Sequence, residues 1–444
     1  MDKRIFSLAV LMIVLGIVLA GCATQPNQDP NAPNNGNNQN PIDNGNVYAA
    51  EGVADMPAHA DDSLATPESV QSVVNANNRF AFELYKEVGS NGGNVFFSPY
   101  SISTAVDMAY EGAKGQTAEE IQKVFHFSDN ADERHAGTAA IYNSLNQQDK
   151  NYALNTANAL WVQEDFPLLK SYTDAVENYL GGIAVELDFK NETEKSRNTI
   201  NAWVEKQTKD KIKELIGPGA LSTATRLVLT NAVYFKGAWT EQFDPDLTEK
   251  KDFRASDSET VQADMMRFGS TKHFQYGEND DLQLLELPYQ GDDLSMLVLL
   301  PKNNDLAKVE SELSADSLKE WKDSMSYEKV VASMPKFKLE ETYDSMGNTL
   351  AGMGMPTAFS DGADFSGIAG KRLYISKVIH KSFVQVNESG TEAAAATAIV
   401  MTISSYNPNV EPPKEFIADH PFVFIIQENS TGNILFIGRL ERPE

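Results

Sequence analysis

Side chains that could perform catalysis are present in the chain, but none is arranged in a known catalytic motif. Two S-x-x-K matches, Ser326 to Lys329 and Ser333 to Lys336, could pair a serine nucleophile with a lysine base. The K-T-G motif that accompanies such a serine in penicillin-recognising enzymes is absent, as are G-x-S-x-G, H-E-x-x-H, Walker A and dinucleotide-binding patterns. A triad can also be assembled from residues far apart in sequence, but no pattern here points to one.

One segment combines the features of a strand with those of an exposed loop. After the strand-like stretch 373–386 comes Glu388 to Ala398 (ESGTEAAAATA), followed by the β-branched residues Ile399, Val400, Thr402 and Ile403 and by Pro408. An alanine-rich helix is one interpretation, since Ala is the best helix former. The β-branched residues and the proline oppose it. With a period of two, one face carries no charge, so we predict a segment that can exist either as a loop or as an added strand.

The single cysteine, Cys22, ends an apolar run that begins at Ile5 and follows Lys3 and Arg4. This pattern is typical of a signal peptide. The residues Leu19-Ala20-Gly21-Cys22 resemble a prokaryotic lipobox, which predicts removal of residues 1–21 and diacylglycerol on the Cys22 thiol. Two acyl chains anchor a protein stably. An ordinary secretory signal with a chance cysteine is the alternative, so we expect an exported protein, anchored at the cell surface or envelope or extracellular.

Composition and charge exclude several classes of protein. The formal net charge is −26, which disfavours a nucleic-acid partner. One cysteine excludes an intrachain disulfide and a multi-cysteine zinc site, and no cofactor is expected. Residues 22–70 are rich in Asn, Pro and Gly and predict a flexible linker after the lipidated cysteine.

Residues 71–444 contain no second linker and no repeat, so they predict a single domain. Thr117 to Glu120 fits a capping box that opens a helix, and residues 193–216 predict a long helix. Predicted strands cover residues 226–235, 282–287, 294–300, 373–386, 422–427 and 434–440. Because strands and helices do not alternate regularly, we expect an α+β fold with mainly antiparallel sheets.

Several stretches, taken together with the alanine-rich segment, resemble the serpin family. They occur in the family's order across residues 73–441: NVFFSPYSI (94–102), TNAVYFKGAW (230–239), MPKF (334–337), ADFSGI (363–368) and DHPFVF (419–424). The resemblance implies one domain of three β-sheets and about nine helices with an exposed reactive-centre loop. It also implies an irreversible suicide-substrate inhibitor of serine, and in some cases cysteine, endopeptidases rather than an enzyme. The target protease cleaves the loop and is trapped as an acyl-enzyme when the loop inserts into the central sheet.

The resemblance also implies a role for individual residues. The hinge of the loop comprises Glu388, Gly390, Thr391, Glu392, Ala393, Ala394, Ala395 and Ala396. The cluster beneath the opening strands, called the shutter, comprises Ser98, Ser101, Asn231 and His380. The breach, where insertion starts, contains Trp239 and Lys336, and Lys336 is expected to pair with Glu388.

The position of the reactive bond remains open. Counting from Glu388 places it at Ser404–Ser405, whereas counting back from Pro421 places it near Pro408, so Ser404, Ser405 and Tyr406 are all candidates. These residues suit elastase-, subtilisin- or chymotrypsin-like targets, and the absence of Lys and Arg from 391–413 disfavours trypsin-like ones. The expected partners of this monomer are a serine protease, held covalently, and a membrane. The alternative is a non-inhibitory serpin that acts as a binding or chaperone-like protein.

Overall fold

The computed structural model describes residues 53–147, 150–391 and 411–443. Nine α-helices lie in these ranges: α1 (Pro67–Gly89), α2 (Pro99–Glu111), α3 (Gly115–Phe125), α4 (Ala131–Leu145), α5 (Lys170–Tyr179), α6 (Thr193–Gln207), α7 (Leu306–Glu312), α8 (Ala315–Asp323) and α9 (Met346–Met353). Local sequence sets several helix starts. Ser98 caps α2 by accepting the Ser101 N–H, and Pro99 occupies its first turn, where no backbone donor is needed.

Strands form two hydrogen-bonded networks among the described residues. The larger contains β1 (Val95–Phe97), β5 (Glu249–Arg254), β6 (Thr260–Arg267), β7 (Lys272–Glu278), β8 (Leu282–Pro288), β9 (Leu294–Pro301), β10 (Ser326–Pro335), β14 (Lys414–Ile417), β15 (Phe422–Glu428) and β16 (Ile434–Leu440). The smaller contains β2 (Tyr152–Gln163), β3 (Ile183–Leu187), β4 (Leu227–Ala238), β11 (Phe337–Tyr343), β12 (Lys377–Asn387) and β13 (Gly390–Thr391).

Strand β10 joins two parts of the larger network. Its residues 326–330 pair with β7, whereas its residues 333–335 pair with β6, and β14 runs parallel to it. The part with β5, β6, β10 and β14 is thus distinct from the part with β1, β16, β15, β9, β8 and β7. Together with the smaller network, these two parts account for the three sheets that the family resemblance implies, and the α+β fold is confirmed.

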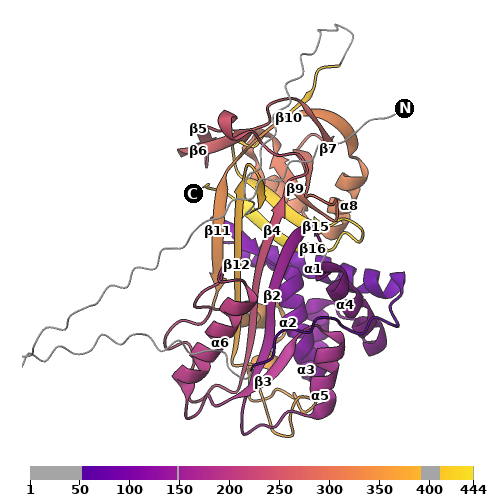
Figure 1. The fold of residues 1–444 in the computed structure, drawn as a ribbon, viewed down its shortest axis with the longest axis vertical. Helices are drawn as coiled ribbons and strands as arrows, with labels where there is room; N and C mark the ends of the chain where they lie inside the picture. Colours follow the sequence, from indigo (N-terminus) through magenta and orange to yellow (C-terminus); the bar gives the residue numbers. More distant parts are fainter. Residues whose placement is uncertain (1–52, 148–149, 392–410, 444) are drawn as a thin grey trace, which may run out of the picture. The chain divides into compact units, whose positions relative to one another are not determined.

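The smaller network is the central sheet, with strand order β11-β12-β13-β4-β2-β3 (Figure 1). Residues 377–383 of β12 pair in parallel with residues 228–234 of β4. We call this junction the seam. Above it, the two strands part and β13 lies between them. The sheet is therefore closed over most of its length and open at one end.

Alternate residues of the central strands face opposite layers, as the period of a strand requires. Ala157, Ala159 and Trp161 of β2 pack with α6, whereas Leu160 and Val162 belong to the core that contains α2. Each face of the sheet is thus covered by its own apolar cluster.

Two predicted helix boundaries were wrong. Helix α3 begins at Gly115, and no side-chain bond caps it; the Thr117 hydroxyl instead accepts the Asp364 N–H. Helix α6 ends at Gln207 rather than near residue 216, because Lys209 and Asp210 take positive φ angles of 53° and 62°, which no helix can continue through.

The predicted linker also ends earlier than residue 70. Helix α1 begins at Pro67 with a capping box between Thr66 and Ser69, and Ala60 is buried at 1% exposure. The described residues before α1 contact the folded body through hydrogen bonds, which composition could not indicate.

Candidate functional site

Two residues of the predicted hinge, Gly390 and Thr391, form part of the central sheet. Gly390 pairs with Asn387 of β12 and Ala238 of β4, and Thr391 pairs with Val386 and Gly237. Strand β13 therefore lies antiparallel between two strands that are parallel to each other. The start of the loop occupies the open end of the seam.

Thr391 is completely buried, and its hydroxyl shares a 2.8 Å hydrogen bond with the Tyr289 hydroxyl. The Tyr289 ring stacks on Trp239, with centroids 4.5 Å apart. Burial raises the pKa of Tyr289, so this phenol stays neutral. The Thr391 side chain therefore lies in a buried, neutral environment, where its hydroxyl has one hydrogen-bond partner.

Gly390 occupies a position that only glycine fits. Its φ is 148°, and a Cβ atom there would lie 2.1 Å from the Gly237 carbonyl oxygen. Residues with a Cβ atom rarely adopt this backbone conformation, and the Gly237 backbone leaves no space for a Cβ atom.

Lys336 and Glu388 form the predicted ion pair, at 3.1 Å between Nζ and Oε2. The Thr248 hydroxyl donates to Glu388 Oε1 at 2.7 Å. Burial alone would raise the pKa of Glu388, but the hydrogen bonds from Thr248 and Lys336 outweigh it and hold the pKa below its usual value. The hinge glutamate is thus kept ionised and fixed.

Trp239 binds the backbone of the turn at residues 387–389 through two hydrogen bonds. Its N–H donates to the Ser389 carbonyl at 2.9 Å, and its indole Nε1–H donates to the Asn387 carbonyl at 3.0 Å. The residues predicted for the breach therefore lie on both sides of the hinge and contact it directly.

Ser98, Ser101, Asn231 and His380 meet beneath the seam. The Ser98 N–H donates to His380 Nε2 at 3.1 Å, and His380 Nδ1 bonds to Asn231 Oδ1. Asn231 Nδ2 donates to the Ser101 hydroxyl. Asn231 and His380 are register partners on β4 and β12, so the network joins the two strands of the seam and the start of α2.

The bonding pattern assigns the neutral Nδ1–H tautomer to His380, because Nε2 accepts a backbone N–H. Burial lowers the pKa of His380 to about 3, so the ring stays neutral at ordinary pH. A neutral ring can accept and donate at once, which a protonated ring could not do.

Sequence reasoning missed four residues of this region. Asn158 of β2 accepts from Asn231 Nδ2 at 2.6 Å and from the Ser101 hydroxyl at 3.0 Å, and the Ser382 hydroxyl donates to the Phe96 carbonyl at 2.7 Å. Tyr289 and Thr248 complete the hinge contacts. A buried position for Asn158, next to the small apolar residues Ala157 and Ala159 of β2, was the one available signal.

The remaining predicted site residues lie outside the described residues: Cys22, Glu392, Ala393, Ala394, Ala395, Ala396, Ser404, Ser405 and Tyr406.

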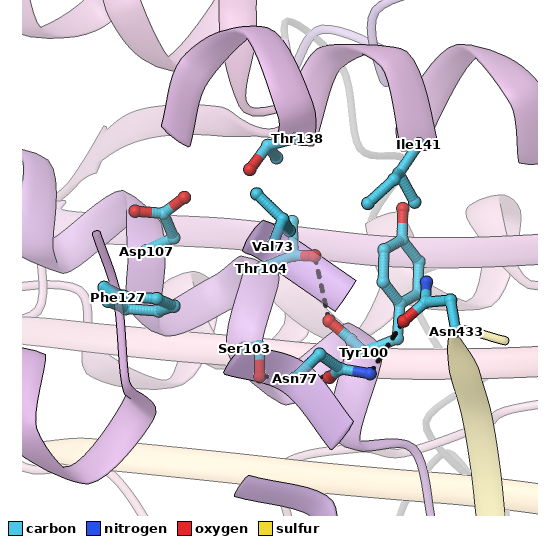
Figure 2. Close-up of a pocket in the computed structure, with 10 residues that line it drawn as sticks. All are labelled: Val73, Asn77, Tyr100, Ser103, Thr104, Asp107, Phe127, Thr138, Ile141 and Asn433. Atoms are coloured by element: carbon cyan, nitrogen blue, oxygen red, sulfur yellow. Dashed lines mark hydrogen bonds between the residues drawn. The ribbon is translucent and has the colours of Figure 1, made fainter. Parts of the chain in front are cut away.

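A cavity beside α2 is lined by residues that belong neither to the hinge nor to the shutter (Figure 2). Its polar lining groups bond to one another: the Thr104 hydroxyl donates to the Tyr100 carbonyl, and Asn77 Nδ2 donates to Asn433 Oδ1 at 2.8 Å. Asp107 pairs with Arg134 at 2.8 Å. None of the ten residues that line this cavity is a histidine, so a serine there has no imidazole base beside it.

The described part of the chain also lacks two other kinds of feature. No group of three or more His, Cys, Asp or Glu side chains there could hold a metal ion. None of the helices it contains has the length and apolar character needed to cross a membrane.

The fold and the hinge define a protein whose central sheet receives the start of a long loop. Comparison with known proteins gives the family: residues 75–443 match the family model described as serpin (serine protease inhibitor). The chain belongs to the serpin family.

Relatives occur in distant organisms. An uncharacterized serpin-like protein of Thermococcus kodakarensis is 43% identical over 437 residues, which cover 98% of each chain. The leukocyte elastase inhibitor of Homo sapiens is 40% identical, over 84% of this chain and all of the relative. Among solved structures, Serpin48, described as a highly specific serpin of the insect Tenebrio molitor, matches with a TM-score of 0.75 and 36% identity, over 84% of this chain and 99% of that one.

Proposed function

We propose that this protein is an irreversible suicide-substrate inhibitor of serine endopeptidases, with some cysteine endopeptidases as further targets. The observation that carries the proposal is the position of Thr391, which already lies between β12 and β4 and continues into the alanine-rich segment. Membership of a family that includes the leukocyte elastase inhibitor supports it.

The proposed chemistry begins with ordinary proteolysis. The protease serine oxygen attacks the carbonyl carbon of the reactive bond, that peptide bond breaks, and the new amino terminus leaves with the C-terminal part of the loop. The acyl-enzyme is then carried away as the cleaved loop extends β13 along the seam, before water can hydrolyse the ester.

Insertion must supply the free energy for this movement. Each added residue gains backbone partners on both sides, at roughly 1 kcal/mol net per hydrogen bond, so a dozen bonds supply on the order of 10 kcal/mol. This is comparable with the stability of many whole proteins. The small residues after Thr391 allow such a strand to enter a packed sheet.

The test is to incubate the chain separately with chymotrypsin, pancreatic elastase and subtilisin, and to analyse the products on denaturing gels. An SDS-stable band at the summed mass, less a C-terminal peptide, is expected with at least one enzyme. The first residue of that peptide identifies the reactive bond among Ser404, Ser405 and Tyr406. Cleavage without a stable band and without any gain in thermal stability would instead support the non-inhibitory alternative.

We further propose that the inhibitor is a monomer exported and anchored through a lipid on Cys22. The apolar run and the position of the single cysteine support this. Intact mass of the membrane-extracted protein tests it, since Cys22→Ser should abolish the added diacylglycerol mass and release the protein from the membrane fraction.

A further inference from the structure

Residues 53–61 cross from α6 to α4 and α5, and we call this segment the strap. In Figure 1 the indigo chain that precedes α1 runs from the side of α6 toward α4. The segment has no helix or strand structure. Its contacts are made with three separate helices, so it links elements that are distant in the sequence.

At one end, the strap binds the last turns of α6. Trp203 Nε1 donates to the Ala54 carbonyl at 2.8 Å. Asp55 Oδ1 accepts from Lys206 Nζ at 2.6 Å and from Gln207 Nε2 at 2.9 Å. The hydrogen bond from Lys206 and then that from Gln207 lower the pKa of Asp55, so its carboxylate stays charged.

At the other end, the strap binds α4 and α5. The Asn143 side chain bonds both to the N–H and to the carbonyl of Ala60, each at 2.8 Å. The Tyr142 hydroxyl donates to the Pro57 carbonyl, and the Asp61 N–H donates to the Asn178 carbonyl at 2.6 Å. Between the two ends, Met56 packs against both the α6 cluster and the small cluster of Ala60, Ala139 and Tyr142.

Helix α6 in turn belongs to an apolar cluster that includes residues of the seam. Its Trp203 packs edge-on against Trp161 of β2, with ring centroids 5.4 Å apart. The same apolar cluster includes Val228 and Ala232 of β4 and Ile379 of β12. An inserted strand would move β4 and β12 apart by about 4.8 Å, the spacing of neighbouring strands. This cluster includes residues from both sides of the seam, so insertion has to divide the cluster to which α6 belongs.

We propose that the strap slows opening of the seam by tying α6 to α4 and α5. The inference rests on the proposed function, because seam opening is the insertion step. The strap contacts stabilise the closed sheet but not a transition state in which they are already broken. Losing these contacts therefore lowers the free-energy barrier to insertion. The strap thereby keeps the loop from inserting before a protease cleaves it.

The test uses the full chain with Asp55→Ala and Met56→Ala combined, and no protease. Spontaneous insertion is followed on warming as a gain in thermal stability at unchanged intact mass. Because Met56 loses apolar burial and α6 loses an ion pair, we expect conversion about tenfold faster than in the wild-type chain. Faster hydrogen exchange at the α6 amides should accompany it.

The matched control is His59→Ala, which removes an exposed side chain from the same segment and should convert at the wild-type rate. The proposal is overturned if the double variant converts no faster than the wild-type chain. It is also overturned if neither chain converts. Failure of the proposed inhibition is seen separately, as the absence of an SDS-stable complex between the wild-type chain and any protease.

Discussion

The hydroxyl groups of Tyr289 and Thr391 share a buried hydrogen bond of 2.8 Å, which joins the residue after β8 to the central sheet. Backbone pairing already places Thr391 between β12 and β4 in the uncleaved chain. Strand β13 is therefore the first part of the inserted strand that we propose, and substitutions in the hinge should change how insertion continues.

Thr391→Arg should convert the inhibitor into a substrate. The guanidinium would have to lie in a buried, neutral environment without a charged partner, which costs several kcal/mol. We expect cleaved protein in place of covalent complex, measured as a stoichiometry of inhibition raised at least about tenfold. Thr391→Ser keeps the hydroxyl and should stay close to wild type. Complex formation at the wild-type stoichiometry by the arginine variant would contradict the insertion argument.

Gly390→Ala should impair insertion at the same place for a different reason. The added Cβ would lie 2.1 Å from the Gly237 carbonyl oxygen, so the backbone pairing of β13 has to shift. Strain of this kind costs about 1–3 kcal/mol. We expect a lower thermal midpoint and more cleaved product per complex formed. Gly370→Ala is the control, since no atom lies within 4 Å of its added Cβ; equal behaviour of the two variants would refute the steric account.

Lys336→Met should loosen the hinge without unfolding the protein. Glu388 is largely buried and would lose the partner that lies 3.1 Å away, while Thr248 would still bind it. We expect several-fold faster hydrogen exchange at the amides of residues 387–391. Lys338→Met removes a more exposed lysine from the neighbouring strand, 3.6 Å from Glu340, and should leave the hinge exchange unchanged. An identical effect of both variants would argue against a specific role for the pair.

His380 predicts a pH dependence with a definite sign. Its pKa is about 3 in the folded chain and near 6.5 when unfolded, so only the unfolded chain binds the proton between these values. Stability is therefore complete above about pH 6.5 and falls as the pH drops toward 3. Relative to His380→Gln, the wild-type chain should lose about 2 kcal/mol of unfolding free energy from pH 6 to pH 4. Urea unfolding of the uncleaved form measures it, with the exposed His59→Gln as control; a parallel pH dependence of wild type and His380→Gln would count against a buried neutral ring.

Much of the candidate site could be predicted because its residues lie in recognisable motifs. Ser98 and Ser101 belong to one such motif, and Asn231 and Trp239 to another. Their partners were harder to predict. Asn158 is placed beside Asn231 only by the pairing of β2 with β4, and Tyr289 reaches Thr391 only through the turn after β8. Contacts between distant segments depend on register, which one sequence does not reveal.

The contacts of the strap also could not be predicted from the sequence. Few of residues 53–66 are large and apolar, so composition favoured a linker. Their order comes from backbone groups that bond to Trp203, Asn143 and Tyr142, side chains supplied by other helices. Composition measures what a segment can bury but not which donors its neighbours offer.

The most direct test of the account is to lock the seam. Lys381 and Ala232 are register partners on β12 and β4, at the spacing of neighbouring strands, so cysteines at both positions in a Cys22→Ser chain can form a disulfide across the seam. The control places cysteines at Lys338 and Gln385, partners on β11 and β12 that need not separate.

With a protease that the wild-type chain traps, the account predicts cleavage without covalent complex while the seam disulfide is intact, and recovery of the complex after reduction. The control pair should form complex in both states. Complex formation at full yield with the seam disulfide intact would contradict insertion between β4 and β12.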